Sequence, residues 1–210
     1  MIIRNFKIIY LYTTLIVSKK FLFYYFVIYY FVFFNKIKTT WEQRKLGEVA
    51  ERFDNLRVPI TASSRIPGIN PYYGANGIQD FVNGYTHDGE FILVAEDGAN
   101  DLKDYPIHYV NGKVWVNNHA HVLQGKDNIC KNIYLKYSIK SINLEPFLVG
   151  GGRSKLNSDV MMKLEIFIPS IIEQINISKF IVGLEKLITL HQRNIFYISP
   201  DIDLITKSMS

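Results

Sequence analysis

The sequence has 210 residues, which is enough for one full domain with a buried core and little more. Hydrophobic residues make up 48% and charged residues 20%, a balance that fits a globular protein. The net charge of +5 comes from residues 1–40, which hold six of the 24 Lys and Arg residues and no acidic residue. The rest of the chain has 18 basic and 19 acidic residues, so its net charge gives no support for nucleic-acid binding. The lone Cys130 excludes an internal disulfide and predicts a cytoplasmic protein.

Residues 1–40 form an apolar, aromatic-rich leader. Phe21–Phe34 is an unbroken run of fourteen apolar or aromatic residues, which as a helix would cover roughly 21 Å, short of the roughly 30 Å hydrocarbon thickness. Joining it to Ile8–Val17 would bury Lys19 and Lys20, and no small-residue cleavage site follows. A spurious translation from an upstream start, a vestigial segment, a membrane anchor and a folded extension all stay open.

The pattern changes after residue 40. Trp41–Arg52 places Leu46, Val49 and Ala50 at helical spacing, so we expect one or two helical turns there. Residues 54–71 contain three prolines and a glycine and are predicted to form a loop. The segment from Tyr72 to Leu123 is predicted to be rich in strands.

Turn dipeptides divide this strand-rich region. Asn-Gly pairs stand at residues 76–77, 83–84 and 111–112, the last predicting a hairpin between Ile107–Val110 and Val114–Val116. Phe91–Ala95 is a continuous apolar run that predicts a strand buried on both faces. His119–Leu123 is expected to form a further strand.

Helical character returns in the last third of the chain. We expect helical or mixed structure over 132–139 and 144–149, a glycine-rich loop at Gly150–Lys155 and a short strand at Leu164–Ile168. An apolar helical face then recurs from Ile171 to about Asn194, and Pro200 is expected to end any helix.

Seven short motifs now appear in a recognisable order. They are W-E-x-R-K-L-G-E from Trp41, Y-Y-G-A-N-G from Tyr72, E-D-G-A-N from Glu96, W-V-N-N-H-A-H-V from Trp115, G-G-x-x-K-L-N from Gly151, I-P-x-x-x-E-Q from Ile168 and L-I-T-L-H-Q-R from Leu187. This order is similar to that of the specificity subunits of type I restriction-modification enzymes. The resemblance covers about 41–194.

The resemblance implies an α+β fold: a β-rich target-recognition domain over 41–169, followed by a long amphipathic spacer and dimerisation helix over 170–195. Residues 196–210 would form an unrelated tail. Such subunits normally carry two recognition domains, each reading half of a bipartite DNA site, and long helices that dock methyltransferase subunits. With one domain and one helix, this chain resembles a half-subunit or a truncated, non-functional fragment.

The partners implied are double-stranded DNA, methyltransferase subunits, indirectly a restriction subunit, and a second specificity half-subunit or a second copy. No cofactor is expected. Cations in loops suit phosphate contacts, and Asn, Gln and His side chains suit base edges. The predicted DNA-binding residues are Arg57, Arg65, Asn76, Gln79, Lys103, Asn117, Asn118, His119, Arg153, Ser154 and Lys155. For each of the Asn residues an ordinary turn or strand-end role is the alternative.

The predicted partner helix uses Ile175, Phe180, Leu184 and Leu187. Two other classes of protein stay open. A membrane-tethered protein would use Phe21–Phe34, and a self-contained nuclease would use Glu96 and Asp97 with nearby histidines. The spacings match no standard metal motif, and no methyltransferase signature is present, so we expect no metal site and no catalytic centre.

Overall fold

The structure is a computed structural model that describes residues 41–151 and 154–207. The predictions about the 1–40 leader and about Arg153 therefore lie outside the described residues. Within the described part, no helix is both long enough and apolar enough to cross a membrane. Residues 41–210 form one unit of the chain and 1–40 another, and only the first is considered below.

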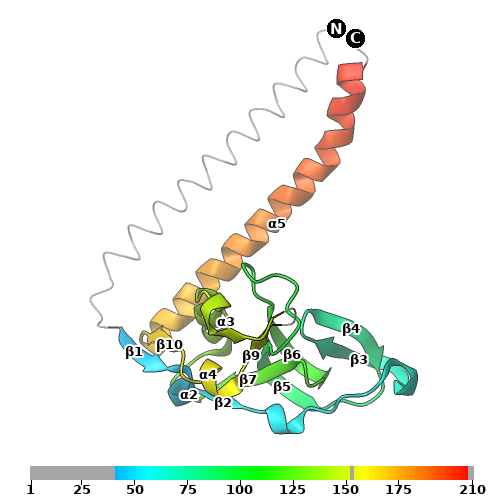
Figure 1. The fold of residues 1–210 in the computed structure, drawn as a ribbon. Helices are drawn as coiled ribbons and strands as arrows, with labels where there is room; N and C mark the ends of the chain where they lie inside the picture. Colours follow the sequence, from blue (N-terminus) through cyan, green and yellow to red (C-terminus); the bar gives the residue numbers. More distant parts are fainter. Residues whose placement is uncertain (1–40, 152–153, 208–210) are drawn as a thin grey trace. The chain divides into compact units, whose positions relative to one another are not determined.

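Strands dominate the first two thirds of the described chain (Figure 1). The elements are β1 (Glu42–Lys45), α2 (Leu46–Val49), β2 (Ala50–Arg52), the 3-10 turns η1 (Asp54–Leu56) and η2 (Ala62–Ser64), β3 (Pro67–Gly74), β4 (Gly77–Val82), β5 (His87–Ala95), β6 (Ile107–Val116), β7 (Ala120–Gly125), α3 (Asn132–Lys140), η3 (Glu145–Phe147), β8 (Leu148–Val149), β9 (Lys155–Leu156), α4 (Ser158–Met161), β10 (Glu165–Ile168) and α5 (Ile171–Lys207).

The main sheet has six strands in the order β2-β7-β5-β6-β3-β4. Its pairs are antiparallel except β3 with β6, which run parallel. Two small sheets, β1-β10 and β8-β9, complete the strand pairing. The predicted α+β class, a strand-rich domain followed by a long helix, is therefore confirmed.

Strand β5 separates two hydrophobic clusters, as its continuous apolar sequence predicts. Ile92 and Val94 belong to one cluster, which includes the buried side of α3, whereas Phe91 and Leu93 belong to the other. All four side chains are buried because alternate residues of a strand point to opposite faces. Residues 91–95 therefore supply the centre of the core, and β5 pairs with β6 on one side and β7 on the other.

The prediction of helical turns across Trp41–Arg52 is only partly right. A single turn, α2, forms at Leu46–Val49 and buries both of those side chains. The flanking residues are strands, because β1 pairs with β10 and β2 pairs with β7. Long-range strand pairing therefore overrides the local helical spacing.

The predicted hairpin at Asn111-Gly112 is wrong. Both residues lie inside the single strand β6, opposite Glu90 and Gly89 of β5. Gly89 and Gly112 have φ angles of +138° and +93°, which glycine adopts without a steric penalty, so the strands bend there without a turn. The prediction for residues 54–71 as pure loop is also wrong at its end, since β3 begins at Pro67.

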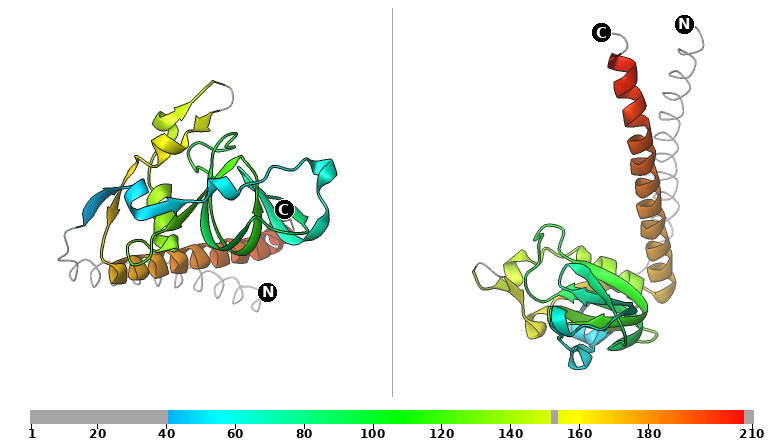
Figure 2. Two further views of the ribbon diagram at one scale, coloured as in Figure 1. Left: turned by 90° about the horizontal axis from the view of Figure 1, so that it is seen from below. Right: turned by 90° about the vertical axis from the view of Figure 1, so that its right-hand side faces the viewer.

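The predicted end of the last helix near Asn194 is wrong as well. Helix α5 runs on through Pro200 to Lys207 and is continuous in every view (Figure 1; Figure 2). A proline inside a helix removes one backbone hydrogen bond and costs about 3 kcal/mol, but the turns on either side keep their own bonds. The segment predicted to be an unrelated tail is thus largely helical.

We predict that Leu93→Ala lowers the free energy of unfolding by about 2 to 5 kcal/mol, because it empties a fully buried position. The matched control is Ile69→Ala at a side chain that is 89% exposed, where a change within about 0.5 kcal/mol is expected. Urea denaturation of both variants measures this. Equal losses for the two variants would show that β5 is not the centre of the core.

Candidate nucleic-acid interface

The loop Glu96–Asn100, which follows β5, is hydrogen-bonded to segments from three other parts of the chain. Asn76 donates from Nδ2 to the carbonyl of Gly98 at 2.9 Å and accepts from the amide of Asn100 at 2.9 Å. The amide of Glu96 donates to the carbonyl of His119, and that of Gly98 to the carbonyl of Ser154. We call residues 75–76, 96–100, 117–119 and 154–155 the loop cluster.

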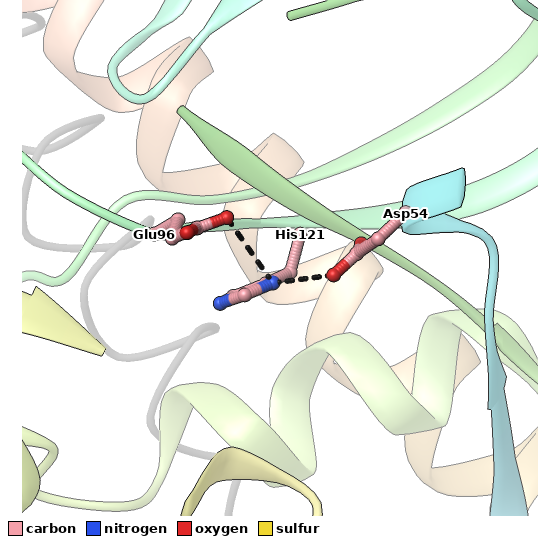
Figure 3. A group of neighbouring side chains, drawn as sticks. All are labelled: Asp54, Glu96 and His121. Atoms are coloured by element: carbon pink, nitrogen blue, oxygen red, sulfur yellow. Dashed lines mark hydrogen bonds and ion pairs between the residues drawn. The ribbon is translucent and has the colours of Figure 1, made fainter. Parts of the chain in front are cut away.

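An ion-pair network lies beside the loop cluster and joins η1, β5, β7 and β9. Glu96 binds Arg57 at 2.6 Å and Lys155 at 2.8 Å. Figure 3 shows His121 between Asp54 and Glu96, with Nδ1 2.7 Å from the Asp54 carboxylate and 3.6 Å from that of Glu96. Four segments distant in sequence are thereby tied to one point.

Both nitrogens of the His121 ring have oxygen partners. Its Nδ1 lies 2.7 Å from the carboxylate of Asp54, and its Nε2 lies 2.8 Å from the carbonyl oxygen of Leu156. A backbone carbonyl can only accept, so Nε2 donates in the second of these bonds. The side chain is only 2% exposed, and a buried polar ring needs such partners.

The network lowers the pKa values of its two carboxyl groups. Burial by itself raises the pKa of Asp54, but hydrogen bonds from His121 and from the Val122 amide outweigh burial and hold the pKa below its ordinary value. At Glu96 burial likewise raises the pKa, and the hydrogen bonds from Lys155 and Arg57 bring it below the ordinary value. Both groups are therefore carboxylates at neutral pH.

Asp54, Glu96 and His121 place ligand-type atoms within 4.8 Å of one another, so a metal ion has to be considered. Hard cations prefer carboxylate oxygens, and His is a common metal ligand. Here, however, Arg57 and Lys155 already bring positive charge to the two carboxylates, and both His121 nitrogens are already hydrogen-bonded to oxygen atoms of the protein. The donor set fits an ion-pair network and does not fit a metal centre.

Several of the predicted DNA-binding residues come together in this region. Asn76, Asn117, Asn118, His119, Ser154 and Lys155 all belong to the loop cluster. Asn117 accepts the His119 amide on its Oδ1 at 2.8 Å, and His119 Nδ1 lies 2.7 Å from Asp97. The side chain of Asn118 is exposed, and those of His119 and Lys155 are 34% and 46% exposed.

Arg57 is also brought to this place, but inside the network. Its side chain is 15% exposed, and it binds the Glu96 carboxylate and three backbone carbonyls, those of Asp54, Asn118 and Ala120. The other candidates lie elsewhere. Arg65 pairs with Asp80 and stacks on the ring of Tyr72, Gln79 is exposed on β4, and Lys103 is exposed in the loop before β6.

Helix α5 begins with a capping box that the Ser170-x-x-Glu173 spacing could have predicted. The Ser170 hydroxyl accepts the Glu173 amide, and the Glu173 carboxylate accepts the Ser170 amide. Buried Gln174 then ties the helix to the domain, accepting from the Lys131 amide and donating to the carbonyls of Ile129 and Pro169. The helix also contacts α3, where Tyr137 donates to Glu185.

The predicted partner residues of α5 differ in exposure. Ile175, Phe180 and Leu184 are half-buried, and Ile175 lines a groove of about 310 Å³ with Ile133 and Val182. Leu187 is 37% exposed. Ile172 and Leu190 lie within the predicted apolar face but were not among the predicted partner residues. They are 72% and 55% exposed and lie five full turns apart on one side of the helix with Leu187.

Sequence reasoning also missed Asp54 and missed the role of His121. The two residues are 67 positions apart, and no local motif relates them. The buried His121 carried no signal in the sequence, because the strand alternation of β7 predicts only that it points inward.

Comparison with known proteins agrees with this fold. Residues 38–196 match the family described as "Type I restriction modification DNA specificity domain". The chain therefore belongs to the type I restriction-modification DNA specificity family. This membership agrees with the prediction of a recognition component and not a catalytic one.

Individual relatives are longer than this chain. A Haemophilus influenzae protein named as a type I restriction enzyme specificity subunit is 44% identical over 146 residues, covering 70% of this chain and 38% of that protein. The Escherichia coli EcoprrI specificity subunit is 29% identical over 58% of this chain and 29% of its own length. The crystal structure of the type I S subunit from M. genitalium has the same fold, with a TM-score of 0.62 at 14% identity, over 72% of this chain and 40% of that one.

We predict that Asp54→Asn destabilises the protein by about 1 to 3 kcal/mol at pH 7, because it removes the carboxylate that binds the buried His121 ring and the Val122 amide. Since the folded-state pKa of Asp54 lies below the ordinary value of 3.8, its contribution is present above that pH and is lost as pH falls through the folded-state pKa. The gap between wild type and variant should therefore shrink as pH falls below 3.8.

Urea denaturation across this pH range measures the gap. Asp88→Asn, at an exposed aspartate of β5, is the control and should leave stability nearly unchanged at every pH. A gap for Asp54→Asn that is absent at pH 7, or that grows on acidification, would contradict the network as described.

Proposed function

We propose that this chain is a DNA-sequence-recognition component that reads one half of a bipartite DNA target through the loop cluster. It would act only in an assembly with methyltransferase subunits. The observation that carries the proposal is the gathering of six candidate contact residues at one loop cluster in a chain of the DNA specificity family. The chain spans 38% and 29% of the two curated relatives, so the second half-site would need another recognition domain.

The loop cluster supports both kinds of DNA contact. The Lys155 side chain is nearly half exposed and carries an ammonium group, which suits a phosphate contact. Asn118 and His119 stand on a turn that hydrogen bonds fix from several sides, which suits base edges, because Asn can pair with adenine in the major groove. The acidic residues at this end have partners within the protein: Glu96 pairs with Arg57 and Lys155, and Asp97 contacts the His119 ring.

Helix α5 supports the proposal of partners. Its start is anchored to the domain through Gln174, whereas Ile172, Leu187 and Leu190 are exposed on one side. Exposed apolar side chains at helical spacing favour packing against another helix. We propose that this side binds a second specificity chain or a second copy, that the helix contributes to methyltransferase docking, and that a restriction subunit joins only through that assembly. DNA as the ligand supports a cytoplasmic location.

Two substitutions test the loop cluster in the chain assembled with the methyltransferase subunits of its own system. Asn118→Ala should reduce binding to a duplex that carries the target sequence, the one that the assembly methylates, by about 5- to 100-fold. Binding to a random duplex should stay unchanged, because only one base contact is lost. Lys155→Gln should weaken binding to both duplexes and reduce the salt dependence of the affinity by about one ion, because one phosphate contact is lost.

The target is defined first, by sequencing-based mapping of the methylation made by the wild-type assembly. Asn111→Ala on β6 and Lys45→Gln on β1 are matched controls at exposed positions outside the loop cluster and should bind as wild type. Methylation without a recurring motif, or Asn118→Ala behaving as the control, would contradict the proposed function.

A further prediction concerns α5. We expect the full chain to form a dimer in sedimentation equilibrium, and Leu187→Glu to shift it to a monomer, because the glutamate would be buried against the partner helix. Gln192→Glu adds the same charge about 140° around the helix and should leave the dimer intact. A wild-type chain that stays monomeric at high concentration would contradict pairing through α5.

A further inference from the structure

The guanidinium group of Arg57 donates its hydrogen bonds to acceptors within the protein. Its Nε donates to the carbonyl of Asp54 at 3.0 Å, and Nη1 donates to the carboxylate of Glu96 at 2.6 Å and to the carbonyl of Ala120 at 2.9 Å. A longer contact of 3.4 Å reaches the carbonyl of Asn118, and Nη2 lies 3.6 Å from the Asp54 carboxylate. With a side chain only 15% exposed, Arg57 is a poor candidate for a phosphate contact.

The carbonyls that Arg57 binds belong to the turn that presents Asn118 and His119. Its two backbone acceptors there, Asn118 and Ala120, lie on either side of His119. The turn is fixed from the other side as well, because Asn117 accepts the His119 amide and Asp97 holds the His119 ring. Arg57 therefore supports from inside the protein the turn that exposes Asn118 and, in part, His119.

We propose that Arg57 is a positioning residue for DNA reading, which sets the Asn117–His119 turn against the end of β5 without touching DNA itself. This inference rests on the proposed function of the loop cluster. The planar fork of arginine holds Asp54, Glu96 and the turn at once, and a lysine ammonium at the same place cannot match that geometry. A displacement of about 1 Å in a reading side chain costs specificity before it costs stability.

The test is Arg57→Lys, which keeps the positive charge, in the chain assembled with its methyltransferase subunits. The quantity measured is the ratio of affinities for the methylated target and for a random duplex. We expect this ratio to fall by about tenfold, while the affinity for the random duplex and its salt dependence stay as in wild type. Arg44→Lys, at a surface arginine paired with Glu48, is the control and should not change the ratio.

Two results overturn the proposal. An unchanged ratio shows that the turn does not need Arg57. A parallel loss of affinity for both duplexes with a salt dependence reduced by about one ion shows that Arg57 contacts a phosphate directly. A wild-type assembly without any target preference is a different result: it contradicts the proposed function, and the positioning role with it.

A second variant covers the case in which Arg57→Lys does not fold. Asp97→Ala releases the His119 ring at a less buried position, and we expect it to lower the same ratio in the same way. An Asp97→Ala ratio equal to wild type overturns the idea that the fixed turn sets specificity.

In addition, Arg57→Lys should cause no further loss in an Asn118→Ala/His119→Ala background, since the positioned side chains are already gone, and a further loss overturns the proposal.

Discussion

The buried His121 ring and its three oxygen partners form the interaction on which the candidate interface depends. A polar ring that is 2% exposed is stable only if polar partners compensate for its lost hydration, and here Asp54, Glu96 and the Leu156 carbonyl do so. Each partner comes from a different segment. Pairing of β7 between β2 and β5 therefore also brings η1, the end of β5 and β9 together.

Arg57 and Lys155 offset the negative charge of the Asp54 and Glu96 carboxylates. Two carboxylates in one small region would repel each other, and Arg57 and Lys155 relieve this repulsion from opposite ends of the network. Arg57 is directed inward to the backbone of the turn before β7, whereas Lys155 extends into solvent. Arg57 thus supports the interface from inside the protein, whereas the Lys155 side chain is exposed where a ligand can reach it.

The sequence predicts the fold class and the buried strand β5 well, because a continuous apolar run has few alternative structures. It predicts the loop cluster in part, since Asn76, Asn117 and Gly150–Lys155 carry local turn signals. It fails at Trp41–Arg52 and at Asn111-Gly112, where pairing with distant strands outweighs local preference. The pairing of Asp54 with His121 could not be predicted, because only the folded sheet brings them together.

Arg57 shows a related limit. An arginine in a proline-rich loop has the composition of a DNA contact, and only the positions of Asp54, Glu96 and Ala120 reveal that its donors are used inside the protein. Family membership does not settle this point either, since specificity within such a family resides in particular side chains and not in the shared fold.

The central claim is that the loop cluster is the surface that meets DNA. Hydrogen–deuterium exchange of the assembled chain, with and without a duplex that carries its target, tests this most directly. The account predicts slower exchange on DNA addition in peptides covering 96–100, 117–119 and 154–155, with no change in β1 and β10. Protection confined to the β3–β4 hairpin, or to β1 and β10, would place the DNA elsewhere and contradict the account.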